Sequence, residues 1–183
     1  VIARTIAAAI PNETALFVSS SRPIRDLEGF AVPRSGVVTY ANRGLAGIDG
    51  NISTALGIAH SHKATVAILG DLSFLYDLTG LIQKEEINCR FIVINNDGGG
   101  IFSTLPQRGS HGFETVFGTP HGLNPAEIAK SMGVSAKQIS SLKELEAEVK
   151  SPISGISVVV CDVPDRESNA DNLKAIYDSL KSF

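Results

Sequence analysis

The feature that most constrains this chain's fold is a regular alternation between short apolar runs rich in β-branched residues and longer stretches with helical spacing. Such alternation is typical of βα units, whose strands pair in parallel. The runs are continuously apolar, which indicates that helices cover both faces of the sheet. The sequence therefore predicts a single α/β domain with a parallel sheet between two helical layers.

The expected elements follow from this pattern. Strands are expected at 15–19, 37–40, 64–69, 90–94 and 156–163. Helices are expected at 1–10, 23–30, 51–60, 73–86, 125–132, 142–149 and 172–180. Residues 103–122 have little periodicity and predict a long loop, which in a compact domain is usually functional or disordered.

Composition excludes several classes of protein. The 16 Lys and Arg residues are scattered and are outnumbered by 19 Asp and Glu, so nucleic acid is not an expected partner. The apolar runs are far shorter than the roughly 18 residues of a membrane-spanning helix, so no stable membrane insertion is expected. Cys89 and Cys161 lie in or beside apolar runs, which favours free thiols and a cytoplasmic location.

Polar and glycine-rich segments follow four of the expected strands, at the sheet edge where ligands bind in folds of this class. They are SSSRP (19–23), NRGLAGIDG (42–50), GDLS (70–73) and NNDGGG (95–100). Ordinary turn chemistry explains many of these residues. It does not require a carboxylate at one strand end and an amide pair with three glycines at the next.

Asp71 and Asn96 lie at the ends of successive βα units, so their side chains can meet at one edge of the sheet. Carboxylate and amide oxygens suit Mg²⁺, which also retains positions for water and phosphate oxygens. The main chain near Gly98 can supply another ligand and approach a diphosphate closely. Ser73 lies in the first turn of the next helix, where main-chain amides favour phosphate.

These residues carry a family resemblance. Gly70-Asp71, followed after a helix and a strand by Asn95-Asn96, resembles the bipartite motif of thiamine-diphosphate-dependent enzymes. NRGLAGIDG, GDLSFLYDLTGL and NNDGGGIFSTLP are most similar to the 2-succinyl-5-enolpyruvyl-6-hydroxy-3-cyclohexene-1-carboxylate synthases of menaquinone biosynthesis. The resemblance implies that 1–183 form the C-terminal diphosphate-binding domain of a longer protein, without its pyrimidine-binding and middle domains.

The resemblance also implies roles for individual residues. It makes Asp71, Asn96 and the Gly98 carbonyl ligands of Mg²⁺, with Mn²⁺ as an alternative. Thiamine diphosphate would contact Ser21, Gly47, Ile48, Gly70, Leu72, Ser73, Gly99 and Ile101. Ile48 would prop the cofactor in a bent form, although an Ile in a loop more commonly packs on the core. Substrate would contact Arg25, Arg43, Phe102 and Phe117, of which the two Phe residues are equally compatible with the core.

The implied activity is that of a transferase. It decarboxylates 2-oxoglutarate and adds the succinic-semialdehyde unit to isochorismate. The activating glutamate belongs to the pyrimidine-binding domain of another subunit in a homo-oligomer, a dimer or a tetramer. We therefore expect no catalytic residue in this chain and no turnover from it alone.

Two alternatives remain open. One is another thiamine-dependent decarboxylase or carboligase, of the acetolactate-synthase type. The other is a stand-alone nucleotide or diphosphate binder, against which the sequence shows neither Gly-x-Gly-x-x-Gly nor a P-loop motif.

The histidines and Asp97 are less informative. None of the four histidines has metal-ligand spacing. We expect His111 and His121 to be exposed in the long loop, with substrate contact as the alternative. Asp97 stands where the family often has Asn, and would add negative charge beside the cation.

Overall fold

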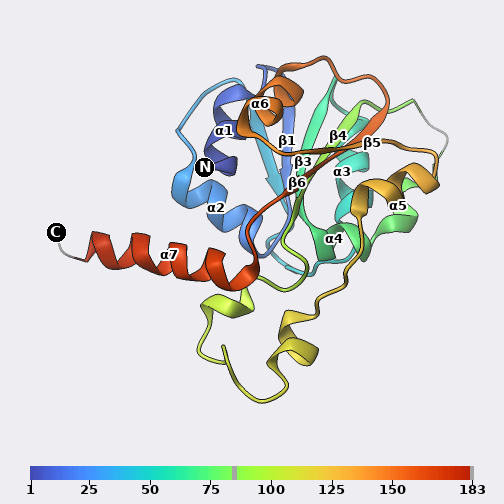
Figure 1. The fold of residues 1–183 in the computed structure, drawn as a ribbon. Helices are drawn as coiled ribbons and strands as arrows, with labels where there is room; N and C mark the ends of the chain where they lie inside the picture. Colours follow the sequence, from blue (N-terminus) through green and yellow to red (C-terminus); the bar gives the residue numbers. More distant parts are fainter. Residues whose placement is uncertain (84–85, 182–183) are drawn as a thin grey trace.

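A parallel sheet forms the centre of the computed structural model, which describes residues 1–83 and 86–181. Its strands are β1 (Ala15–Val18), β2 (Val38–Ala41), β3 (Thr65–Gly70), β4 (Cys89–Asn95), β5 (Ser135–Ile139) and β6 (Ile156–Asp162). They lie in the order β2-β1-β3-β4-β6-β5, and every neighbouring pair is parallel. Figure 1 shows the strands running side by side through the body of the molecule.

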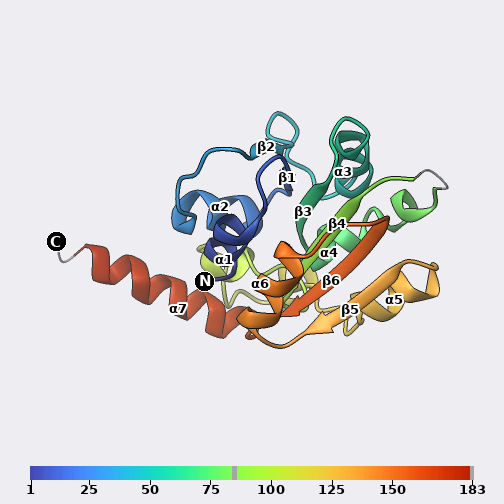
Figure 2. The same cartoon turned by 90° about the horizontal axis from the view of Figure 1, so that it is seen from above.

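Helices cover both faces of this sheet. They are α1 (Ile2–Ala9), α2 (Arg22–Phe30), α3 (Asn51–Ala59), α4 (Asp71–Leu75), α5 (Pro125–Ser131), α6 (Leu142–Lys150) and α7 (Arg166–Leu180). Three short helical turns, η1 (Leu78–Leu81), η2 (Phe102–Thr104) and η3 (Glu114–Gly118), complete the helical structure of the described chain. In Figure 2, α1, α2 and α6 lie on one side of the sheet and α3, α4 and α5 on the other.

Two apolar cores result from this layering. Phe17 and Phe91 point to the face of α3, α4 and α5, where they pack with Phe74. Their strand neighbours Leu16 and Ile92 point to the opposite face and pack with α1, α2 and α6. The three-layer parallel fold and single domain predicted from the sequence are therefore confirmed.

One strand was missed. β5 is a largely exposed edge strand of the sequence Ser-Ala-Lys-Gln-Ile that pairs only with β6. Its residues are mostly polar or small, so it lacks the apolar run by which the other strands, including the opposite edge strand β2, can be recognised.

The expected helix at 73–86 was wrong. The chain forms only α4 and then the η1 turn, while residues 84 and 85 lie outside the described residues. The buried carboxylate of Asp77 accepts hydrogen bonds from Ser53 N at 2.7 Å and Ser53 Oγ at 3.2 Å, at the N-terminus of α3. This tertiary contact takes the place of a continued helix.

The C-terminal helix is longer than expected and projects from the body of the molecule (Figure 1). It begins at Arg166 rather than 172 because Asp165 caps it, accepting a hydrogen bond from Ser168 N at 2.9 Å. Each helix within 1–83 and 86–181 falls short of the length or apolarity needed to cross a bilayer.

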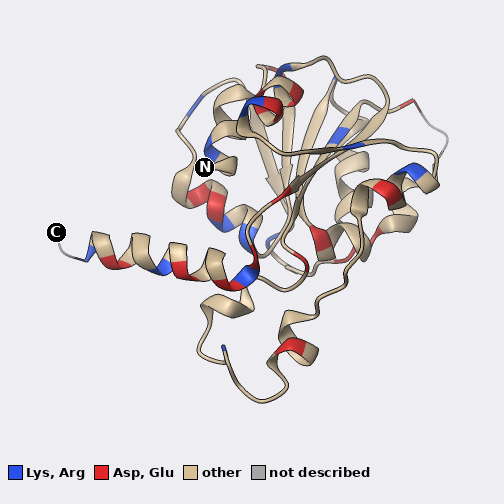
Figure 3. Ribbon diagram, in the orientation of Figure 1, with Lys and Arg blue, Asp and Glu red and all other residues tan. Residues whose placement is uncertain are grey.

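Charged residues are dispersed over the described surface. In Figure 3, Lys and Arg occur on several elements and are interleaved with Asp and Glu.

Arg90 joins β4 to the C-terminal end of α6 and is buried. Its guanidinium donates hydrogen bonds to the carbonyls of Glu148, Ser151 and Pro152, the last two at 3.0 and 3.1 Å, and to Ser151 Oγ at 2.9 Å. Burial lowers the pKa of Arg90. The side chain thus adds donors to carbonyls at the C-terminal end of α6, of which Glu148 O also accepts a hydrogen bond from Ser151 N at 3.2 Å.

Replacing Arg90 by Met is expected to lower the free energy of unfolding by about 2–3 kcal/mol, because the hydrogen bonds from the buried guanidinium to these carbonyls and to Ser151 Oγ are lost. Urea denaturation measures this change. Lys143→Met is the control, since Lys143 is exposed on α6, and a change within about 0.5 kcal/mol is expected. Equal stability of the two variants would contradict the capping role of Arg90.

Candidate functional site

A cavity of about 1300 Å³ lies at the carboxyl ends of β1, β3 and β4. Most residues singled out from the sequence line it: Ser21, Arg25, Arg43, Gly47, Ile48, Gly70, Asp71, Leu72, Ser73, Asn96, Gly98, Gly99, Ile101 and Phe102. Phe117 is the exception. Its ring packs on Phe102 and Phe113, with centroids 5.4 and 5.8 Å apart, and is not among the lining residues.

Asp71 is the buried carboxylate of this cavity, 2% exposed. β3 ends at Gly70 and α4 begins at Asp71, which places the side chain at the sheet edge. Asp71 Oδ1 accepts a hydrogen bond from Leu72 N at 2.7 Å, and Oδ2 accepts from Gly98 N at 2.8 Å and Asn96 N at 3.2 Å. Main-chain donors thus fix a carboxylate that would be costly to bury without partners.

The Asn96 amide completes a cluster of polar atoms around Asp71. One end of the amide lies 3.3 Å from Asp71 Oδ2 and 2.8 Å from the Gly98 carbonyl. With the nitrogen at that end, the amide donates hydrogen bonds to both oxygens. With the oxygen there, a carboxylate, an amide oxygen and a carbonyl oxygen lie together, which is the donor set that a hard divalent cation needs. Asp71 Oδ2 already accepts from Gly98 N and Asn96 N, so Oδ1, which accepts from Leu72 N, is the carboxylate oxygen that would face the cation. These residues therefore fit such a cation.

A cation here would rely on few charged ligands. Within the described residues, no group of three or more His, Cys, Asp and Glu side chains is placed to hold a metal. The cluster supplies one carboxylate, one amide oxygen and one carbonyl, so the remaining ligands must come from water or from a bound anion. That composition is typical of magnesium sites that share the ion with a phosphate group.

The glycines after β4 pack directly on the main chain of η3. Gly99 N donates a hydrogen bond to Gly118 O at 2.7 Å. A Cβ on Gly98 would lie 2.1 Å from Gly118 O, and one on Gly99 would lie 2.2 Å from Phe117 O. Gly98 also has a φ of +127°, which strongly favours glycine. Side chains at these positions would displace either the cation loop or η3.

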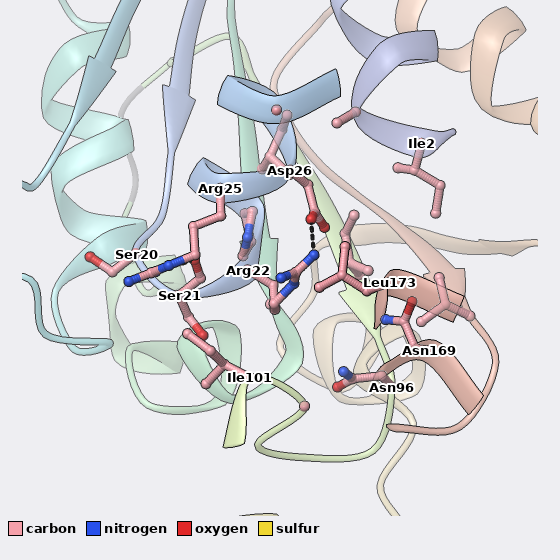
Figure 4. A pocket seen from close by; sticks show the side chains of 18 of the residues that line it. Ile2, Ser20, Ser21, Arg22, Arg25, Asp26, Asn96, Ile101, Asn169 and Leu173 are labelled. Carbon is pink, nitrogen blue, oxygen red and sulfur yellow. Dashed lines mark hydrogen bonds and ion pairs between the residues drawn. The ribbon is translucent and has the colours of Figure 1, made fainter. Parts of the chain in front are cut away.

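The ends of β3 and β1 contribute hydroxyl groups. Ser73 is buried within α4. Ser21 precedes α2 with a φ of +75°, a strained conformation for a residue other than glycine. Ser20 Oγ donates to Asn42 O at 3.3 Å, which ties the end of β1 to the loop after β2. In Figure 4, Ser20 and Ser21 lie on the side of the cavity opposite Asn96.

Arginines give the cavity a positive character. Those that line it are Arg4, Arg22, Arg25 and Arg43, against Asp26 and Asp71. Arg25 Nη1 donates to Ser21 O at 2.7 Å, and Arg43 is exposed in the loop at 42–50. Although the chain carries a net charge of −3, its cavity is therefore suited to anions.

Arg22 and Asp26 form an ion pair that the sequence analysis did not single out. It lies within the cavity in Figure 4, where the dashed line marks the contact. Burial raises the pKa of Asp26, although Arg22 acts in the opposite direction. Residues four apart on a helix lie on the same face, so the spacing of Arg22 and Asp26 could have predicted this ion pair.

His121 is a second residue that was missed, and its expected exposure was wrong. Its Nε2 lies 3.2 Å from Asp71 Oδ2, and its side chain is only 10% exposed. His111, in contrast, is exposed as expected. Nothing in the sequence near His121 signals a contact with a residue so distant in the chain.

Asp97 holds the turn that carries His121. Its Oδ1 accepts hydrogen bonds from Gly122 N at 2.7 Å and His121 N at 3.0 Å. The hydrogen bond from Gly122 is the main reason that the pKa of Asp97 lies below its usual value. Besides its charge near Asn96, Asp97 therefore has a structural role that the sequence did not reveal.

Comparisons with known proteins identify the family to which the chain belongs. Residues 29–163 match the family model of the thiamine pyrophosphate enzyme C-terminal TPP binding domain. The 2-succinyl-5-enolpyruvyl-6-hydroxy-3-cyclohexene-1-carboxylate synthase of Thermobifida fusca is 38% identical over 188 residues, covering 98% of this chain and 33% of the relative. The enzyme of that name from Bacillus cytotoxicus is 43% identical over 167 residues, covering 87% and 28%. The chain thus spans about a third of the length of these curated relatives.

Solved structures share the fold at lower identity. Benzoylformate decarboxylase from Polynucleobacter necessarius aligns with a TM-score of 0.68 and 19% identity, over 89% of this chain and 32% of its own. A putative thiamin diphosphate-dependent enzyme from Mycobacterium smegmatis aligns with a TM-score of 0.65 and 21% identity, over 90% and 31%. Together with the family match, these findings show that the chain belongs to the thiamine pyrophosphate enzymes, as a C-terminal TPP-binding domain.

Proposed function

We propose that this chain is the diphosphate- and cation-binding part of a 2-succinyl-5-enolpyruvyl-6-hydroxy-3-cyclohexene-1-carboxylate synthase of menaquinone biosynthesis. The whole protein would decarboxylate 2-oxoglutarate and transfer the succinic-semialdehyde unit to isochorismate. The observation that carries the proposal is the convergence of Asp71, Asn96 and the Gly98 carbonyl in the cavity. Identities of 38 and 43% to synthases of this name support the choice of reaction.

Asp71, Asn96 and the Gly98 carbonyl would hold Mg²⁺, with Mn²⁺ as a second cation of similar chemistry. The diphosphate would share that ion and accept hydrogen bonds from the hydroxyls of Ser21 and Ser73. The main-chain amides of Leu72 and Gly99 would complete its contacts, and Gly70 and Ile101 would bound the same pocket. In this structure Leu72 N donates to Asp71 Oδ1 and Gly99 N to Gly118 O, so each amide would exchange its present partner for the diphosphate.

The loop at 42–50 would contact the thiamine end of the cofactor. Ile48 is half-buried and, with Gly47, lines the cavity, which supports its proposed role of bending the cofactor. When bound, thiamine diphosphate supplies the electron sink that decarboxylation of a 2-oxo acid requires. The contribution of this chain is to hold and orient the cofactor.

Arg25 and Arg43 would orient the carboxylates of the two substrates. Both 2-oxoglutarate and isochorismate are dicarboxylic, and a guanidinium group can bind a carboxylate through two parallel hydrogen bonds. Both arginines line the cavity, as does Phe102, which would form part of its apolar wall. We do not extend this role to Phe117, whose ring packs on Phe102 and Phe113.

The complete site would lie between two subunits of a cytoplasmic homo-oligomer, a dimer or a tetramer. The pyrimidine-binding domain of another subunit would supply the activating glutamate, so this chain would provide no catalytic residue. Since a middle domain and a pyrimidine-binding domain would be needed as well, the 183-residue chain alone should show no turnover.

The test uses the protein expressed from its intact gene. With thiamine diphosphate and Mg²⁺, it is expected to release CO₂ from 2-oxoglutarate and to consume isochorismate. Preference for pyruvate would instead indicate the acetolactate-synthase type.

For the 183-residue chain, calorimetry should detect weak binding of thiamine diphosphate with Mg²⁺. Binding of NAD or ATP in its place would favour a stand-alone nucleotide binder, and synthase activity from this chain alone would contradict the proposed division of roles.

A further inference from the structure

The chain between η2 and α5 folds back onto the cation site. We call residues 105–122 the return segment. Near its end, Asp97 Oδ1 accepts the main-chain hydrogen bonds of His121 and Gly122. Arg108 anchors its beginning through ion pairs with Glu167 and Asp171 of α7. The return segment is therefore held at both ends by charged side chains.

His121 extends from this segment to Asp71, the proposed cation ligand. Its Nδ1 accepts a hydrogen bond from Leu123 N at 3.0 Å, so the ring hydrogen lies on Nε2. Nε2 is 3.2 Å from Asp71 Oδ2 and therefore donates a hydrogen bond to the carboxylate. The nearly buried ring is thus fixed at both nitrogens.

His121 differs from the other donors to Asp71 Oδ2. Gly98 N and Asn96 N belong to the loop after β4, which itself carries the other two cation ligands. His121 is the side-chain donor to this oxygen from a distant segment. With Oδ2 occupied by these donors, Oδ1, which accepts from Leu72 N at 2.7 Å, is the oxygen that would bind the cation. A carboxylate that binds a metal through one oxygen depends on hydrogen bonds to the other for its orientation, and losing one typically weakens metal binding 10–100-fold.

We infer that His121 is a positioning residue, which holds the Asp71 carboxylate in the orientation that binds a divalent cation and couples cation binding to the docked return segment. The inference rests on the proposed function, since the cation site is part of it. Coupling between two sites is reciprocal. A docked return segment should strengthen cation binding, and a bound cation should stabilise the docked segment.

Arg108 provides a natural reporter of that coupling. Trypsin cleaves after arginine, and cleavage of the Arg108–Gly109 bond requires local release of the ion pairs to α7. Bound cation should therefore slow cleavage at this bond. The effect can be followed by mass spectrometry of the tryptic products without measuring enzyme activity.

The experiment compares His121→Phe, which keeps ring bulk without a donor, with His121→Gln, whose amide nitrogen can donate to Asp71. Mn²⁺ affinity is measured by electron paramagnetic resonance with thiamine diphosphate present, on the protein from the intact gene.

We expect His121→Phe to bind Mn²⁺ about tenfold more weakly and to lose the Mn²⁺-dependent protection of Arg108. His121→Gln should remain within about threefold of the wild type, consistent with a retained donor. The control His111→Phe, at an exposed position of the same segment, should match the wild type.

A role limited to packing predicts the opposite order, with His121→Phe close to the wild type and His121→Gln impaired. That order, or equal affinity and protection in all variants, would overturn the inference and leave the proposed function standing. If His121→Phe does not fold, a tenfold loss in His121→Gln overturns the inference on its own. Absence of Mn²⁺ binding to the wild type would instead refute the proposed function, and the inference with it.

Discussion

Replacing Asp71 by Asn is expected to weaken divalent-cation binding at least about 100-fold. Losing only an outer hydrogen bond to a metal ligand typically weakens binding 10–100-fold, and this substitution changes the ligand itself. The substitution removes the charged member of the Asp71–Asn96–Gly98 cluster. The new side-chain amide nitrogen would also face the main-chain N–H groups that donate to the Asp71 carboxylate, so donor would meet donor. Calorimetric titration of Mg²⁺ in the presence of thiamine diphosphate measures the loss.

Asp77→Asn is the matched control for this prediction. Asp77 is also a buried carboxylate that accepts hydrogen bonds, but its partner is Ser53 at the N-terminus of α3. Both variants should lose about 1–2 kcal/mol of unfolding free energy, since each disturbs buried hydrogen bonds. Only Asp71→Asn should lose the cation. Equal cation affinity in the two variants would show that Asp71 is not a ligand.

The position of the cavity could be predicted from the sequence because topology determines it. In a parallel sheet the carboxyl ends of all strands lie at one edge, so any polar residue directly after a strand is brought near the others. To predict that Asp71 and Asn96 lie close together, it was enough to recognise β3 and β4 as neighbouring strands. Their parallel pairing shows that they are neighbours. Continuous apolar runs made both strands easy to recognise.

Contacts made by segments without periodicity could not be predicted. The break after α4 depends on the contact of Asp77 with Ser53, and the burial of His121 depends on its contact with Asp71. Each is a single hydrogen-bonded pair between residues far apart in the chain, and a local pattern carries no signal for it. Phe117 is a related case: the sequence was equally compatible with a pocket wall and with the core, and its ring packs on Phe102 and Phe113.

Gly98→Ala is expected to disrupt both stability and cation binding. A Cβ would meet the Gly118 and Thr119 carbonyls at 2.1 and 2.9 Å, and the φ of +127° is unfavourable for alanine. Backbone strain of about 1–3 kcal/mol and overpacking of similar size together predict a loss of about 4 kcal/mol of unfolding free energy. Urea denaturation measures this loss, and Mg²⁺ titration should show weaker binding because the Gly98 carbonyl is displaced.

Gly57→Ala separates this effect from the general consequences of adding a methyl group. Gly57 lies exposed in α3, where a Cβ would meet nothing within 4 Å. Alanine should stabilise this helix by about 0.5–1 kcal/mol, opposite in sign to the change at Gly98. If Gly98→Ala were as stable as the wild type and still bound Mg²⁺, the main chain at 98 would have room to move. The close packing of this loop on η3 would then not be what positions the carbonyl, and the cation site would depend on the side chains of Asp71 and Asn96 alone.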